Sequence, residues 1–359
     1  MNKSSIQYAS LLLLSREEKN FSAIGRIFGK SGQTISRMID PKKDLIAFLN
    51  GKIDSFFSKD KKITLIIDDT LISKRYAHEI EGTGFFYDSS LRSEQRSFNM
   101  RTCVLTDGKK ILPLDCDFLI DTRLVDRSDG DNYKEKIKNN KKQNKEKKQQ
   151  FITEMIFHVL QYILKERLIV AVDGWFMSIE LLMWALKNSI KIEGRARANA
   201  VVMYKNNLVA LRDIKNILPK GRQMCRTVKV YWHGLPLFLT VQKRIDRHNN
   251  VTFVYQFATY QTKKPIEHVN QYKKRWAIER FFRICKQDLG LKDCQSTVFD
   301  VQQRHILSVF CAFTMAQEWA IAKKCSNIES AIRSIQAHKQ EFLDLLIHRP
   351  NHIFHHVSS

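Results

Sequence analysis

Two unbroken runs of apolar, largely β-branched residues constrain the fold of this chain more than any other feature. Residues 63–67 read ITLII and are followed by Asp68, and residues 168–172 read LIVAV and are followed by Asp173. A continuous apolar run is typical of a strand that is covered on both faces. Ligand sites of α/β sheets form outside the carboxyl ends of strands, so the two carboxylates are expected to converge if the strands are neighbours. Taken singly, each aspartate is better explained as a helix cap or a turn residue.

The charge balance points to a polyanionic partner. The 359 residues include 60 Lys and Arg against 37 Asp and Glu, which gives a formal net charge of +23. A basic surface also suits an anionic membrane, but the most apolar stretch, residues 306–316, is too short to span a bilayer and predicts a buried helix. No signal peptide is visible at the N-terminus, so we expect a cytoplasmic, nucleoid-associated protein. The seven cysteines are scattered without a Cys-x-x-Cys pair, which argues against disulfides and structural zinc.

The remaining pattern predicts an α/β protein with helical ends. Two strands, 96–106 and 110–120, flank the turn at Asp107 and Gly108, and short β-rich runs fill residues 190–260. The Lys-, Asn- and Gln-rich segment 129–150 is interpreted as a solvated loop or helix face in preference to a dedicated DNA contact. Helices are expected at 151–166, 178–187, 266–289, 301–324 and 328–347. We therefore divide the chain into residues 1–55, 60–190, 191–262, 263–295 and 296–359.

Residues 21–39 have the pattern of a helix-turn-helix. Ser22 is the expected N-cap of the first helix, Gly29 lies at the turn and Ser31 can cap the second helix. Ala23, Ile24, Ile27, Ile35 and Met38 are expected to face inward, and the second helix presents Gln33, Thr34 and Arg37 outward, where they could enter a major groove. An ordinary helical hairpin fits the pattern equally well, and the net charge favours DNA.

The predicted helix 266–289 carries the most specific pattern. At about 100° per residue, Tyr272, Arg275, Glu279 and Lys286 fall within a stripe about 60° wide. Mixed charge on a solvated helix is common, so this periodicity alone favours an ordinary solvated helix over a functional site. Two carboxylates brought close together normally imply a bound cation, and oxygen ligands suit Mg²⁺ or Mn²⁺.

These four residues, in the segment YKKRWAIERFFRICK, resemble the Tyr-Arg-Glu-Lys signature of bacterial insertion-sequence transposases of the DDE class. The resemblance extends to IDDT at 67–70, to AVDGWF at 171–176 and to the β-rich insertion, and covers roughly residues 63–291. It implies an RNase H-like mixed sheet flanked by helices, with a β-rich insertion domain before the glutamate helix and a small helical N-terminal DNA-binding unit outside the matching region.

The resemblance also implies a site and an activity. Asp68, Asp173 and Glu279 would hold two Mg²⁺ ions, with Mn²⁺ as a substitute, while Tyr272, Arg275 and Lys286 would contact DNA near the transposon end. The protein would bind double-stranded DNA at terminal inverted repeats, cut it by metal-dependent hydrolysis and transfer the 3′-hydroxyl ends to target DNA, as a homodimer in the synaptic complex. Trp232 and Trp276 are candidates to stack on a flipped base, although packing roles are favoured for both.

Two alternatives stay open at this point. A structure-specific nuclease of the same fold would cut without joining, and a non-catalytic DNA-binding derivative would do neither. Asp69 also competes with Asp68, because side chains alternate along a strand and only one of the pair can point into the site. Asp68 is chosen because the family places its first acid two residues before the threonine.

Overall fold

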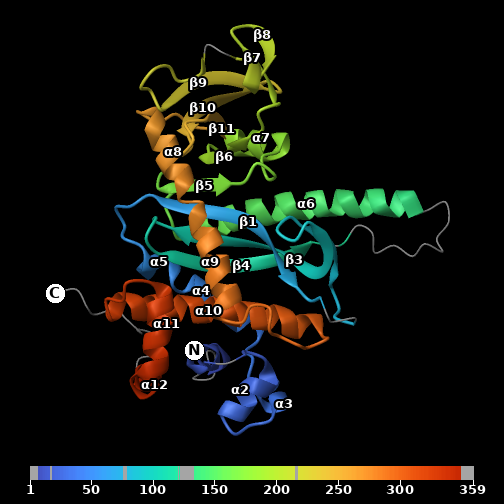
Figure 1. Ribbon diagram of the computed structural model, residues 1–359, viewed down its shortest axis with the longest axis vertical. Helices are drawn as coiled ribbons and strands as arrows, with labels where there is room; N and C mark the ends of the chain where they lie inside the picture. Colours follow the sequence, from blue (N-terminus) through green and yellow to red (C-terminus); the bar gives the residue numbers. More distant parts are fainter. Residues whose placement is uncertain are drawn as a thin grey trace.

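A large mixed sheet organises the molecule. The computed structural model describes residues 7–16, 18–75, 79–119, 121, 133–214 and 217–348. Within them, eleven strands form one sheet in the order β2-β3-β1-β5-β6-β11-β10-β9-β7-β8, with β4 paired to β3 (Figure 1). The sheet runs along the long axis of the molecule, with helices packed on both faces of its lower part.

Five strands make the core of this sheet. They are β4 (Ile111–Leu119), β3 (Ser93–Thr106), β1 (Ile63–Ser73), β5 (Leu168–Val172) and β6 (Ile192–Ala196). β1, β5 and β6 are parallel, while β3 is antiparallel to β1 and to β4. β2 (Gly84–Asp88) adds a hairpin partner to β3. This mixed sheet, flanked by helices, is the RNase H-like fold that the sequence predicted.

The β-rich segment extends the same sheet. β11 (Val251–Ala258) pairs with β6 and continues through β10 (Leu235–Ile245) and β9 (Cys225–Trp232) to β7 (Val201–Tyr204) and β8 (Asn207–Ala210). A short 3-10 helix, η2 (Leu211–Asp213), follows β8. These strands have their own hydrophobic cluster and occupy the upper end in Figure 1.

Burial on both faces of β1 and β5 explains their continuous apolar sequences. Ile66 lies in the cluster shared with α1 (Gln7–Leu14), α4 (Lys42–Asn50) and α10 (Phe299–Ala322), whereas Leu65 and Ile67 lie in the cluster shared with α6 (Tyr133–Leu160) and α7 (Ile179–Lys187). α5 (Ile53–Phe56) joins the second cluster, and α11 (Ile328–Ala337) and α12 (Lys339–His348) join the first. The sheet is therefore covered on both sides.

The N-terminal helices form the expected hairpin, with one difference at its start. α2 (Phe21–Ile27) is capped by Asn20, whose side chain accepts from the Ala23 amide, and not by Ser22. Ser31 caps α3 (Gly32–Arg37) as predicted, and Gly29 takes the left-handed conformation at the turn, φ +63°. Ile27 was expected to face inward but is 37% exposed, because the short α2 ends there.

Four further predictions of the elements need correction. The helix expected at 328–347 is interrupted at His338 and forms α11 and α12. β1 does not stop at Ile67 but continues to Ser73, because β3 pairs with it beyond the end of β5. The predicted helix 266–289 is two helices, α8 (Pro265–Lys273) and α9 (Trp276–Gln287). The helix expected at 151–166 ends at Leu160 and begins at Tyr133, so much of the lysine-rich segment is helical. Residues 129–132 of that segment lie outside the described residues.

The apolar C-terminal helix is a core element. By length and composition, α10 is long and apolar enough to cross a membrane, but 83% of its most apolar stretch is buried inside the protein. This agrees with the prediction of a buried helix at residues 306–316. All seven cysteines are free thiols, and six of them are buried.

Candidate active site

The register of the parallel strands brings the two aspartates together. Ile67 pairs with Val172, which is the last pair between β1 and β5, so Asp68 and Asp173 follow side by side. β5 ends there, whereas β1 continues against β3 with Asp68 opposite Thr102. Asp173 contributes to the raised pKa of Asp68, as expected for two carboxylates close in space.

Glu279, the third acid, is linked to Asp68 by the side chain of Arg275. One Arg275 nitrogen donates to Asp68 Oδ2 at 2.8 Å, and the other donates to Glu279 Oε1 at 2.6 Å. Arg275 lies in the break between α8 and α9 and is followed by the first turn of α9. Its guanidinium therefore lies between the two carboxylates and bonds to both.

The other two members of the stripe also contact the ends of the central strands. Lys286 donates to Thr70 Oγ1 at 2.7 Å, and the Tyr272 hydroxyl donates to the Val172 carbonyl at 3.4 Å. Burial raises the pKa of Tyr272 to about 12, so its hydroxyl keeps its proton. The structure thus places Tyr272, Arg275 and Lys286 against β1 or β5, with Glu279 bonded to Arg275, although the helix is broken between them.

Asp68 and Asp69 point to opposite faces of the sheet. Asp68 faces α9 and Arg275, whereas Asp69 accepts from Arg101 Nε at 3.3 Å. The Arg101 side chain is only 1% exposed and lies over the Phe176 ring, on the α6 side of the sheet. Asp69 therefore balances a buried charge, and Asp68 is the acid that lies with Asp173.

Burial dominates the electrostatics of the site. Loss of hydration raises the pKa of Asp68 to about 7, despite the opposing charge of Arg275. Loss of hydration also lowers the pKa of Lys148 to about 8, although Asp69 and Asp173 act in the other direction. Charged groups at this edge of the sheet are thus costly unless they find partners.

Within the described residues, no three His, Cys, Asp or Glu side chains lie close enough to hold a metal ion as they stand. Asp68 and Glu279 are instead bridged by the guanidinium of Arg275. The donors that converge here are carboxylate oxygens, which is the ligand type that Mg²⁺ and Mn²⁺ prefer. The carboxylate oxygens of these residues therefore suit a divalent ion, at a place where Arg275 now bridges Asp68 and Glu279.

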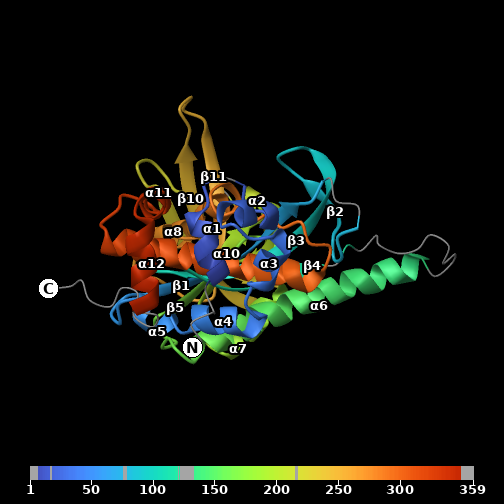
Figure 2. The ribbon, with the colours of Figure 1, turned by 90° about the horizontal axis from the view of Figure 1, so that it is seen from below.

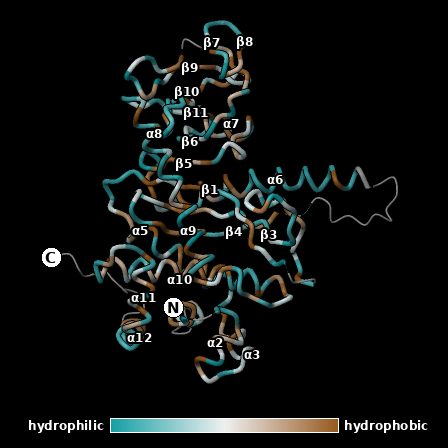
Figure 3. Tube along the Cα trace, in the orientation of Figure 1, coloured by the Kyte–Doolittle hydropathy of each residue, from teal (hydrophilic) through white to brown (hydrophobic). Residues whose placement is uncertain are grey.

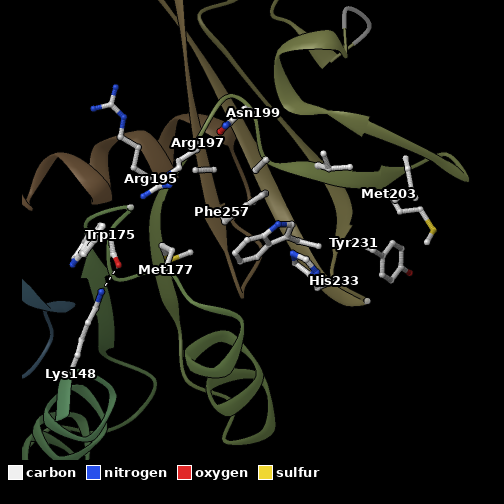
Figure 4. Close-up of a pocket in the computed structure, with 17 residues that line it drawn as sticks. Lys148, Trp175, Met177, Arg195, Arg197, Asn199, Met203, Tyr231, His233 and Phe257 are labelled. Atoms are coloured by element: carbon white, nitrogen blue, oxygen red, sulfur yellow. Dashed lines mark hydrogen bonds between the residues drawn. The ribbon is translucent and has the colours of Figure 1, made fainter. Parts of the chain in front are cut away.

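A cavity of about 790 Å³ is lined by Gly174 and Trp175, the two residues that follow Asp173, and sequence reasoning missed it. Figure 4 shows Lys148 and Trp175 on one side and Arg195 and Arg197 on another. Trp175 is 65% exposed, an unusual position for a side chain of this size. The GRARAN segment at 194–199 carried the available signal, because it places Arg195 near the end of a buried strand and Arg197 directly after it.

The two tryptophans considered as base-stacking candidates have different surroundings. Trp232 lines the cavity but packs on Phe257, with ring centroids 5.4 Å apart in a stacked arrangement. Trp276 is 64% exposed and lines a second hollow, of about 510 Å³, together with Glu279, Arg280 and Arg283. The packing role favoured for both is therefore seen for Trp232 and not for Trp276.

The outward residues of the helical hairpin lie far from these acids. Gln33, Thr34 and Arg37 are exposed on α3. Figure 1 shows α2 and α3 at the lower end of the molecule, beyond α10, with the inserted strands at the upper end. Any DNA that contacts both α3 and the acids must therefore extend along the long axis of the protein.

The fold and the site together define an RNase H-like protein with carboxylates at the ends of its central strands. Comparison with protein-family models matches residues 3–224 to the DDE superfamily endonucleases. The chain belongs to this family. No curated protein matches it significantly. The matched region contains Asp68 and Asp173 and ends before Glu279, so the Tyr-Arg-Glu-Lys signature stays a prediction.

Proposed function

We propose that this chain is a DNA transposase that recognises the terminal inverted repeats of an insertion sequence, cuts at its ends and joins the 3′-hydroxyl ends to target DNA. Membership of an endonuclease family supports DNA cleavage in general. The observation that carries the finer proposal is the meeting of Asp68, Asp173 and the Arg275–Glu279 pair where β5 ends.

Asp68, Asp173 and Glu279 would hold two divalent ions, Mg²⁺ or Mn²⁺. Such ions supply the charge that activates a water or a 3′-hydroxyl and stabilises the leaving oxygen at phosphorus. Lys286 and Arg275 lie next to the acids and suit charge-assisted contacts with phosphates. Two active subunits would be needed to hold two ends, so a homodimer is proposed for the synaptic complex.

Recognition of the ends is proposed for α3. Its exposed polar face can enter a major groove, and Gln33, Thr34 and Arg37 can reach base edges or phosphates. α1 and α4 pack in the same cluster as α10, so removal of the whole N-terminal region would expose the core. Single substitutions on α3 therefore test this role better than a deletion does.

The test uses a plasmid in which the sequences flanking this reading frame surround a marker, with a second plasmid as target. The wild-type chain with Mg²⁺ is expected to give excised ends and joined products. Asp173→Ala and Glu279→Gln should abolish both while DNA binding in EDTA remains. Cleavage without joining would favour a nuclease, and metal-dependent cutting by these variants would contradict the site.

A further inference from the structure

The helix α6 extends well beyond the sheet that it covers. Its C-terminal half buries Phe151, Ile152, Ile156 and Val159 against the β1–β5 face of the sheet. Its N-terminal half projects from the body of the protein in both ribbon views (Figures 1 and 2). The 28 residues span about 42 Å. Figure 3 shows that the projecting part is almost entirely hydrophilic.

Lysines on the projecting half continue the apolar stripe of the packed half. Residues at i, i+3 and i+4 share one helix face, and the spacing places four lysines within about 40° of the direction of Ile152. Three of them are exposed and the last is half-buried. We call this set the lysine stripe: Lys138, Lys141, Lys145 and Lys148.

The charge of the lysine stripe is poorly balanced along the helix itself. The two glutamates of the projecting part, Glu135 and Glu146, lie about 100° or more from the centre of the stripe. Glu146 pairs instead with Lys142, off the stripe, at 3.9 Å. Among the described residues, Lys145 is the stripe lysine that forms a salt bridge, with Glu180 of α7 at 2.7 Å. A helix face whose only role is to keep the protein soluble would carry lysines and glutamates at alternating positions.

The stripe leads to the candidate active site. Lys148 donates to the Trp175 carbonyl and lies over the Phe176 ring, 4.5 Å from its centroid. Burial lowers the pKa of Lys148, while Asp69 and, to a smaller extent, Asp173 act to raise it, so the last lysine of the stripe lies near the second acid. Figure 4 shows Lys148 reaching toward Trp175 at the edge of the cavity that also holds Arg195.

We propose that the lysine stripe binds the phosphate backbone of duplex DNA and aligns it with Asp173. The inference rests on DNA being the substrate, as in the proposed function, and assigns this part of the contact to α6. The stripe covers about 15 Å of helix, and a DNA strand carries one phosphate per about 3.4 Å of duplex axis, so several phosphates lie within the length of the stripe. The rigid, projecting helix offers this row of charges without any rearrangement of the fold.

The experiment compares two double variants of the full-length chain that lose the same charge. Lys138→Gln/Lys141→Gln removes the two outermost lysines of the stripe, both exposed, and Lys136→Gln/Lys147→Gln removes two lysines on the opposite side of the same helix. Binding of a fluorescein-labelled 40-bp duplex is measured by anisotropy in EDTA at several KCl concentrations. EDTA makes the result independent of cleavage.

The stripe variant is expected to lower the slope of log K against log salt by about 1.8, from two phosphate contacts at about 0.9 each, and to weaken binding up to about 60-fold at 100 mM salt. The opposite-side variant should keep the wild-type slope. Equal losses in both variants, or no loss in either, would overturn the proposal. Failure of Asp173→Ala to stop cutting would instead count against the catalytic site and leave the stripe result intact.

Discussion

Alanine at Asp69 is expected to destabilise the fold, whereas alanine at Asp68 is expected to stop cleavage and leave the fold stable. Among the described residues, Asp69 is the only hydrogen-bond partner of the Arg101 guanidinium, and the Arg101 side chain is 1% exposed. An arginine cannot give up its proton to escape burial. Removing one partner of a buried pair costs about 3 to 5 kcal/mol.

The lower end of that range applies, because Asp117 stays 3.9 Å from Arg101 and the Phe176 ring stays beneath its guanidinium. At about 2.1 cal/mol/K of unfolding entropy per residue, a loss of about 3 kcal/mol lowers Tm by about 4 °C for a chain of this length. Asp68 differs, because burial raises its pKa to about 7 and Arg275 keeps Glu279 as a partner. Its removal should change stability by less than about 1 kcal/mol.

Thermal unfolding and plasmid cleavage of the two single variants separate these roles. The double variant Asp69→Ala/Arg101→Met serves as the control, because a well-packed apolar side chain removes the unpaired charge and should restore most of the lost Tm. The reasoning fails if Asp69→Ala unfolds at the wild-type temperature and has lost cleavage. That result would make Asp69 the first acid of the site.

Three further outcomes follow from the contacts. Arg275→Gln removes the cation between Asp68 and Glu279, so the metal-free variant should have a lower Tm than the wild type. Addition of Mg²⁺ should raise the Tm of the variant by more than that of the wild type, as measured by differential scanning fluorimetry. An equal rise in both proteins would contradict this. Burial lowers the pKa of His305 to about 4, so the unfolded chain binds a proton at a higher pH than the folded chain does. About 3 kcal/mol of folding stability, which is present above pH 6.5, is therefore lost as the pH falls to 4. His305→Gln should show a shallower loss in urea unfolding across that window, and equal slopes would count against it. Arg37→Ala should weaken binding of the terminal repeats in anisotropy titrations at unchanged Tm, because this side chain is exposed; full affinity would move recognition away from α3.

The core of the fold could be predicted because its signals are local. Burial on both faces leaves an apolar run in the sequence whatever the rest of the chain does, so β1 and β5 were found with their acids. The break at Lys274 and Arg275 was missed, because neither glycine nor proline marks it. The cavity lined by Gly174 and Trp175 was also missed, since it depends on which distant segments β6 and β9 bring together.

The lysine-rich segment shows a different limit. Its composition favours a solvated segment and is compatible with both a helix and a loop. The same angular spacing that buries Ile152 and Ile156 continues through Lys145 and Lys141, and this continuity becomes visible only once the packed half of α6 fixes which face points to the sheet. The side of α6 to which the lysines belong is therefore known only once the packing of the helix is known.

The register of β1 also depends on its charged residues. A run that is apolar on both faces specifies register weakly, because a slip by one residue exchanges one apolar side chain for another. The neighbouring acids remove this ambiguity: Arg275 on one face meets Asp68, and buried Arg101 on the other face meets Asp69. A slip that moved Asp69 toward Arg275 would bring Thr70 to Arg101 and leave a buried guanidinium without a carboxylate. The pair of acids thus holds β1 in the one register that places Asp68 beside Asp173.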